Sequence, residues 1–205
     1  MEKKESYRLH LQHYQQPGNE YFVTWCLKAS IPPKALERYT LQLQLLRHEI
    51  SQAEKQGAEK VRIDELMFNY WEARRLYHKA YEDLLNLCTN PVVNLSNTAC
   101  TEIIKESLFY FEGKKLENYA FCIMPNHIHW VFHLKERDAD GQAVYLQDVM
   151  QSVKRFTANQ INKAENRTGT LWQAENFDVT IRNREHLHRA VQYTINNPVK
   201  AGLVT

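Results

Sequence analysis

The chain contains 205 residues, of which 43% are hydrophobic and 24% are charged, with six glycines and six prolines. This composition fits one large or two small folded domains and excludes collagen-like, low-complexity and disordered chains. Lysine and arginine number 26 against 24 aspartates and glutamates, so the formal net charge is only +2. The total charge therefore gives no indication of a nucleic-acid partner.

The N-terminal segment and the cysteines both indicate an intracellular protein. Residues 1–7 are polar and lead into no apolar stretch, and no run approaches the ~18 apolar residues that a membrane helix needs. The cysteines are far apart and form no CxxC pair, so we expect buried free thiols rather than disulfides or a zinc cluster. They are Cys26, Cys88, Cys100 and Cys122. We expect a cytoplasmic location.

The first third of the chain predicts a strand followed by a long helical segment. Aromatic and β-branched residues predict a strand over about 20–29. From Lys34 to Leu87 there is no proline and apolar residues recur at helical spacing, which predicts a helical hairpin broken near Gly57. Residues 34–90 carry nine basic and nine acidic side chains. We expect residues 31–90 to be an inserted helical pair that packs on the domain or on a partner.

The rest of the chain predicts an α+β domain. The expected elements are a helix over 97–112, strands over 117–124 and 127–136, a helix to about 166, a strand over 177–182, and a helix over 185–196 that Pro198 ends. With the first strand, this order is a ferredoxin-like βαββαβ antiparallel sheet with an additional C-terminal helix. We expect one domain from residues 1–30 and 91–205.

A strand in this domain carries a pair of histidines at alternating positions. Ile128 and Trp130 are apolar, so they point into the core, while His127 and His129 lie side by side on the other face. Two such imidazoles can bind one metal ion. His133 lies too far along the strand to share an ion with His127. The HxH pattern is common, however, and a solvated or structural pair is an equal alternative.

The final helix supplies further polar side chains. Tyr193 and Asn197 are four residues apart, so they project from one face of the helix. If this helix lay on the open face of the sheet, Asn197 could complete a His/His/amide site for Mg²⁺ or Mn²⁺. Tyr193 could then attack a phosphodiester and form a covalent phosphotyrosine. Packing is the alternative role, because the chain has 11 tyrosines.

Several motifs together resemble the IS200-type, or REP-associated, tyrosine transposases, a branch of the HUH single-strand endonucleases. The matching segments are Met124-Pro-Asn-His-Ile-His129, Leu171-Trp-Gln173 and Tyr193-Thr-Ile-Asn-Asn-Pro-Val-Lys-Ala-Gly-Leu203, with Tyr7-Arg8, Tyr14, Pro17-Gly18 and Tyr21-Phe-Val-Thr24 near the start. The resemblance covers about residues 1–30 and 95–205. Three separated motifs in the family's order are more specific than HxH alone.

The resemblance implies a role for individual residues. His127 and His129 match the family's metal motif, Tyr193 its single catalytic tyrosine, and Asn197 the polar ligand one helical turn later. Phe177 stands where the family often has a second tyrosine. The helical insertion of residues 31–90 departs from the short family form, so the resemblance does not imply the oligomeric state or the position of any guide-DNA groove. A homodimer is one expected form.

The basic residues concentrate in the C-terminal part. From Val149 onward there are eight basic and four acidic side chains. We expect contacts with DNA from Lys154, Arg155, Trp172, Arg182, Arg184, Arg189 and Lys200. Lysine and arginine would meet phosphates, and an exposed tryptophan could stack on unpaired bases. Solvated helix faces, and a core position for Trp172, are the alternatives.

Two functions from different classes follow. The first is a metal-dependent single-stranded DNA endonuclease and strand transferase that acts at DNA hairpins in the nucleoid through a 5′-phosphotyrosine. The second is a domesticated hairpin-DNA-binding or scaffold protein that no longer cuts. A third function, a metallohydrolase of small molecules, would need a third strong protein ligand, which the sequence does not offer.

Overall fold

The computed structural model describes residues 6–8, 12–14, 16–32 and 34–204. The chain divides into two compact units. One comprises Met1–Ser30 and Asn90–Thr205, and the other comprises Ile31–Thr89. Residues 1–5 of the polar start lie outside the described residues. No helix within the described ranges is long and apolar enough to cross a membrane.

The first unit is built on a four-stranded antiparallel sheet. Its strands are β3 (Glu20–Cys26), β4 (Leu116–Ile123), β5 (His127–Leu134) and β6 (Phe177–Ile181). Their spatial order is β4-β5-β3-β6, so the first and third strands of the motif form the centre of the sheet. The ferredoxin-like βαββαβ arrangement expected from the sequence is confirmed. β4 and β5 form the expected hairpin, in which the amide of Met124 donates to the carbonyl of His127 at 2.9 Å.

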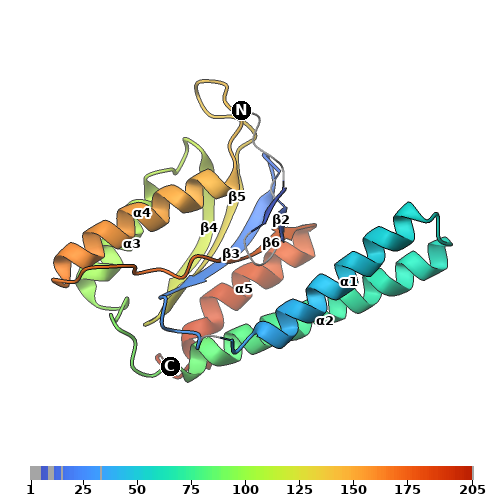
Figure 1. Cartoon of the computed structure of the whole chain (residues 1–205). Helices are drawn as coiled ribbons and strands as arrows, with labels where there is room; N and C mark the ends of the chain where they lie inside the picture. Colours follow the sequence, from blue (N-terminus) through green and yellow to red (C-terminus); the bar gives the residue numbers. More distant parts are fainter. Residues whose placement is uncertain (1–5, 9–11, 15, 33, 205) are drawn as a thin grey trace. The chain divides into compact units, whose positions relative to one another are not determined.

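Helices cover both faces of this sheet. α3 (Thr98–Phe109) and α4 (Leu146–Ala164) pack against each other on one face, whereas α5 (Arg184–Lys200) contacts β4 and β5 from the other face (Figure 1). Asn97 caps α3, because its side-chain oxygen accepts a hydrogen bond of 2.7 Å from the amide of Cys100. The helix that follows the βαββαβ motif therefore occupies the face that the motif leaves open.

The alternation of side chains along the central strands separates the core from the second face. On β5, Ile128 and Trp130 belong to the main hydrophobic core, as do Val23 and Trp25 of β3. The intervening residues, including His129 and its β3 neighbour across the ladder, Thr24, face the side of α5. β5 thus places Ile128 and Trp130 in the hydrophobic core and His129 on the opposite face of the sheet.

The second unit is a helical hairpin formed by α1 (Glu37–Lys55) and α2 (Lys60–Leu87). Gly57 in the connection adopts a φ of 66°, a left-handed conformation that suits glycine. Leu43, Ile50 and Leu66 are buried, and Arg47 donates from Nε to the hydroxyl of Tyr70 at 3.1 Å. The break near this glycine is confirmed.

Several local features differ from expectation. Short strands β1 (Ser6–Arg8) and β2 (Gln12–Tyr14) pair in an antiparallel ribbon that the sequence did not predict. α5 continues through Pro198 to Lys200, so the prediction that this proline ends the helix was wrong. The four thiols are free, as expected, but Cys88 is only half-buried.

Candidate active site

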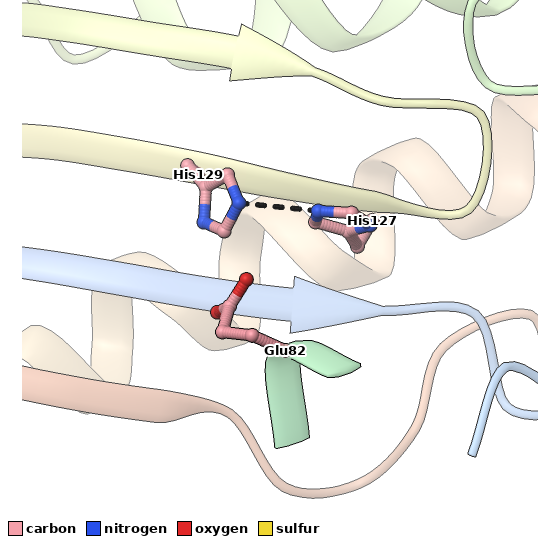
Figure 2. Close-up of side chains that lie close together, drawn as sticks. All are labelled: Glu82, His127 and His129. Carbon is pink, nitrogen blue, oxygen red and sulfur yellow. Dashed lines mark hydrogen bonds between the residues drawn. The ribbon is translucent and has the colours of Figure 1, made fainter. Parts of the chain in front are cut away.

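The centre of the candidate site is the histidine pair on β5 (Figure 2). His127 and His129 point to the same side of the strand, and their Nε2 atoms are 3.1 Å apart. Their ring centroids are 4.7 Å apart with planes inclined at 77°. The two imidazoles that the sequence placed on one face therefore converge on a single point. Glu82, which the figure also labels, belongs to α2 of the helical unit.

Both histidines are held by hydrogen bonds to the ring nitrogen that faces away from this point. Nδ1 of His127 lies 2.7 Å from Oδ1 of Asn126, and Nδ1 of His129 lies 2.8 Å from Oγ1 of Thr24. An amide oxygen only accepts, so the Nδ1 of His127 carries the proton and its Nε2 presents a lone pair. Such outer partners are what orients a metal-binding histidine. Sequence reasoning missed Asn126 and Thr24.

The pair fits a divalent cation. Two nitrogen atoms 3.1 Å apart can both lie ~2.0–2.1 Å from one ion placed between them. The contact between the two Nε2 atoms is itself a hydrogen bond (Figure 2), so one of them carries a proton, and a bound cation would take the place of that proton. These imidazoles could hold a metal ion.

Tyr193 of α5 lies beside this pair. Its ring centroid is 5.4 Å from that of His129, with the planes inclined at 76°. Phe22 of β3 packs edge-on to the tyrosine at 5.7 Å and stacks on His129 at 5.6 Å, so it fixes both rings. Nζ of Lys200 lies 5.0 Å from the centre of the tyrosine ring. The residues on β5 and α5 that the sequence paired are therefore neighbours in space.

Asn197 lies one turn further along α5 on its buried side. The side chain is 5% exposed, and its Oδ1 accepts no hydrogen bond from the residues that the structure describes. A buried amide oxygen without a donor is unfavourable by about 1–3 kcal/mol. A bound cation would satisfy it, because Mg²⁺ and Mn²⁺ prefer oxygen ligands.

The expected DNA contacts divide into exposed and buried side chains. Arg155, Arg182, Arg184, Arg189 and Lys200 are exposed. Arg189 forms a surface ion pair of 3.2 Å with Glu185. Their exposure allows contact with phosphates, and the exposed ion pair of Arg189 is weak.

Trp172 is not available for base stacking. It is 5% exposed, belongs to the core, and packs edge-on to Trp25 at 6.2 Å. Its indole nitrogen donates to Oγ1 of Thr157 at 3.0 Å. The prediction that this tryptophan stacks on DNA was wrong, because the Leu-Trp-Gln segment adds its aromatic ring to the core.

Lys154 is also turned inward. Its ammonium donates to the carbonyl oxygens of Ala174 and Glu175 at 3.0 and 3.4 Å. Burial lowers the pKa of this lysine to about 8, although Glu175 and Asp178 act in the opposite direction. The ammonium thus holds the segment that precedes β6, and we no longer expect it to contact DNA.

Comparison with known proteins adds three findings. The family model described as "Transposase IS200 like" matches residues 89–197. A candidate REP-associated tyrosine transposase from Haemophilus influenzae is 34% identical over 98 residues. That match covers 45% of this chain and 55% of the relative, so the chain spans about half of the relative's length. A solved REP-associated tyrosine transposase bound to a REP hairpin aligns with 18% identity and a TM-score of 0.44, over 100% of this chain and 76% of that one.

Proposed function

Because this chain belongs to the family of IS200-like transposases, we propose that it is a metal-dependent single-stranded DNA endonuclease and strand transferase. It would act at DNA hairpins through a covalent 5′-phosphotyrosine. The observation that carries this proposal is the placement of the Tyr193 ring 5.4 Å from the His129 ring, across the interface between α5 and β5. A tyrosine beside two convergent imidazoles is arranged for phosphoryl transfer.

In the proposed reaction the hydroxyl oxygen of Tyr193 attacks the phosphorus atom of a DNA phosphodiester. A bond forms between this oxygen and phosphorus, and the bond from phosphorus to the 3′ oxygen breaks. The tyrosine proton passes to solvent, and the leaving 3′ oxygen takes up a proton to become a free hydroxyl. The products are a 5′-phosphotyrosine and a 3′-OH end, and attack by a 3′-OH on the phosphotyrosine reverses the step and joins strands.

Side chains around the tyrosine would support this step. His127, His129 and Asn197 would hold Mg²⁺ or Mn²⁺, and the ion would supply positive charge to the phosphate oxygens. The ammonium of Lys200 lies 5.0 Å from the centre of the tyrosine ring and would add a positive charge beside the bound phosphate. Phe22 keeps the tyrosine and His129 in register through its contact with both rings.

DNA would reach the site along the exposed basic residues. Arg182 precedes α5, Arg184 and Arg189 lie in its first two turns, and Lys200 lies at its end, so phosphates could contact both ends of the helix that carries the tyrosine. Hairpin DNA is the partner that the solved relative holds. A homodimer and a nucleoid location remain predictions.

The test is covalent capture of DNA. A single-stranded oligonucleotide that contains a hairpin is incubated with the protein and Mn²⁺ or Mg²⁺, and the adduct is detected after denaturation. We expect an adduct with the wild type, none with Tyr193→Phe, and none in EDTA. Tyr119→Phe is the matched control, since this exposed tyrosine lies on β4 and its hydroxyl donates to Glu20 at 3.1 Å. An adduct with Tyr193→Phe would show that the nucleophile is wrongly assigned.

The alternative is a protein that binds hairpin DNA without cutting it. The observation that favours this function is the exposure of Arg184 and Arg189 on α5, which can contact phosphates without a metal ion. It predicts retained hairpin binding in EDTA and no adduct with either metal. Phosphate contacts by the exposed arginines would survive chelation, whereas cleavage would not.

A further inference from the structure

The second feature with binding chemistry is a pocket between α3 and α4, on the sheet face opposite α5. Its volume is about 450 Å³, and it is lined by Glu106, Ser107, Tyr110, Phe111, Ser152, Arg155, Phe156 and Asn159. All of these residues belong to the sheet unit. Because the histidines face α5, the pocket is separate from the candidate active site.

Aromatic rings form the apolar part of the pocket. Phe111 is 8% exposed, and Phe156 is half-buried beside it. Tyr110 is 62% exposed and packs edge-on to Phe111, with ring centroids 4.9 Å apart. Nζ of Lys114 lies 4.3 Å from the centre of the Tyr110 ring and adds a positive charge beside it. Such rings beside a cation are the surface on which unpaired bases stack.

The polar groups of the pocket have no partners among the described residues. The side chains of Arg155, Asn159 and Glu106 are exposed and form no hydrogen bond or ion pair there. The pocket thus presents donors, from the guanidinium and the amide, together with a carboxylate acceptor.

This combination selects among ligands. A carboxylate repels phosphate and other simple anions, and the mixed donors and acceptor suit a neutral planar ligand that carries both kinds of group. Guanine has this pattern: its O6 and N7 accept from arginine, and its N1–H and N2–H groups donate to a carboxylate. Adenine, cytosine and thymine each offer a carboxylate one donor group, so none of them can donate to both oxygens of Glu106 as the adjacent N1–H and N2–H groups of guanine can.

We propose that this pocket binds an unpaired guanine of a single-stranded DNA segment. Tyr110 and Phe111 would provide the stacking surface, Arg155 would contact O6 and N7, and Glu106 would accept from N1 and N2. The strand's phosphates would lie near Lys114. This inference rests on the proposed function for the identity of the ligand as DNA, and it assigns Arg155 to base recognition instead of phosphate contact.

The experiment measures nucleotide binding without metal or cleavage. Saturation-transfer NMR in EDTA compares dGMP with dAMP, dCMP, dTMP and inorganic phosphate on the Tyr193→Phe protein. We expect a signal for the dGMP base at least about fivefold above the others, and its loss in Arg155→Met and Glu106→Gln. Lys163→Met on α4 and Glu102→Gln on α3 are the matched controls, and they should retain the signal.

A second arm tests the DNA source of the base. A twelve-residue thymidine oligonucleotide with one central guanine should displace dGMP, and the all-thymidine oligonucleotide should not. Equal signals for all bases, displacement by phosphate, or no effect of either pocket variant would overturn the inference. Binding of dGMP that the guanine-containing oligonucleotide fails to displace would also overturn it. Adduct formation by the wild type is measured separately, so failure here leaves the proposed reaction untouched.

Discussion

The hydrogen bond between Thr24 and His129 provides the sharpest test of the metal site. Oγ1 of Thr24 lies 2.8 Å from Nδ1 of His129, and both side chains are fully buried. Thr24→Val keeps the shape of the side chain and removes only the hydroxyl. The imidazole then loses the partner that orients it toward His127.

The expected loss follows from the role of outer partners. Removing such a group weakens metal binding by ~10–100-fold. Since each factor of ten corresponds to ~1.4 kcal/mol, the loss of binding free energy is about 1.4–2.8 kcal/mol. The free energy of unfolding without metal should fall by about 1–3 kcal/mol, because Nδ1 of His129 is left buried without a partner.

Isothermal titration with Mn²⁺ at a fixed pH measures the effect, with urea unfolding as the companion measurement. Thr24→Ser keeps the hydroxyl and should restore most of the affinity. Thr157→Val is the matched control, since Thr157 is a fully buried threonine on α4, remote from the histidines in the fold. It should lose stability but not Mn²⁺ affinity. Unchanged Mn²⁺ binding by a folded Thr24→Val protein would refute the reasoning.

Two further predictions concern the side chains that turned inward. Burial lowers the pKa of Lys154 to about 8 from 10.5, so between these pH values the unfolded chain holds a proton that the folded chain has released. The unfolding free energy of the wild type relative to Lys154→Met should therefore rise by about 3 kcal/mol from pH 8 to 10.5, measured by urea titration; a flat difference would contradict the burial. Trp172→Phe removes the 3.0 Å hydrogen bond to Thr157 and should lower the unfolding free energy by about 1–3 kcal/mol, with unchanged single-stranded DNA affinity. Lost affinity at unchanged stability would restore its role in stacking.

The sheet was predictable from the sequence because its signals are local. The alternation of Ile128 and Trp130 with His127 and His129 fixes which face of β5 enters the core, whatever the rest of the chain does. The paired strands β1 and β2 were missed because three residues each are too few to show a period.

The site was predictable only in part, because its outer shell depends on strand register. Thr24 lies opposite His129 only because β3 pairs with β5 in this register, which couples residues 105 apart in sequence. Nothing in the local pattern around Thr24 indicates this. Trp172 and Lys154 were misassigned for a related reason: their residue types suit DNA, but each forms a hydrogen bond inside the protein with a residue 15 to 20 positions away, Thr157 and Ala174 respectively.

The wrong prediction that α5 ends before Pro198 concerns residues of the candidate active site. Proline inside a helix removes one hydrogen bond and is usually unfavourable by ~3 kcal/mol, which predicts an end at Asn196. The helix instead ends in a Schellman motif, in which Leu203 donates to the carbonyl of Pro198 and Gly202 to that of Val199 at 2.9 and 3.0 Å. The last turn is thus closed from its C-terminal side and retains the proline.

This extra turn decides which residues share a face. In a helix that ended at Asn196, Asn197 and Lys200 would lie in irregular chain with no fixed relation to Tyr193. Because α5 reaches Lys200, the three residues stand at positions i, i+4 and i+7 of one helix. The contact of Lys200 with the Tyr193 ring is one direct consequence of this spacing. The common placement of Tyr193, the amide oxygen of Asn197 and the ammonium of Lys200 therefore depends on a helical turn that the usual effect of proline would exclude.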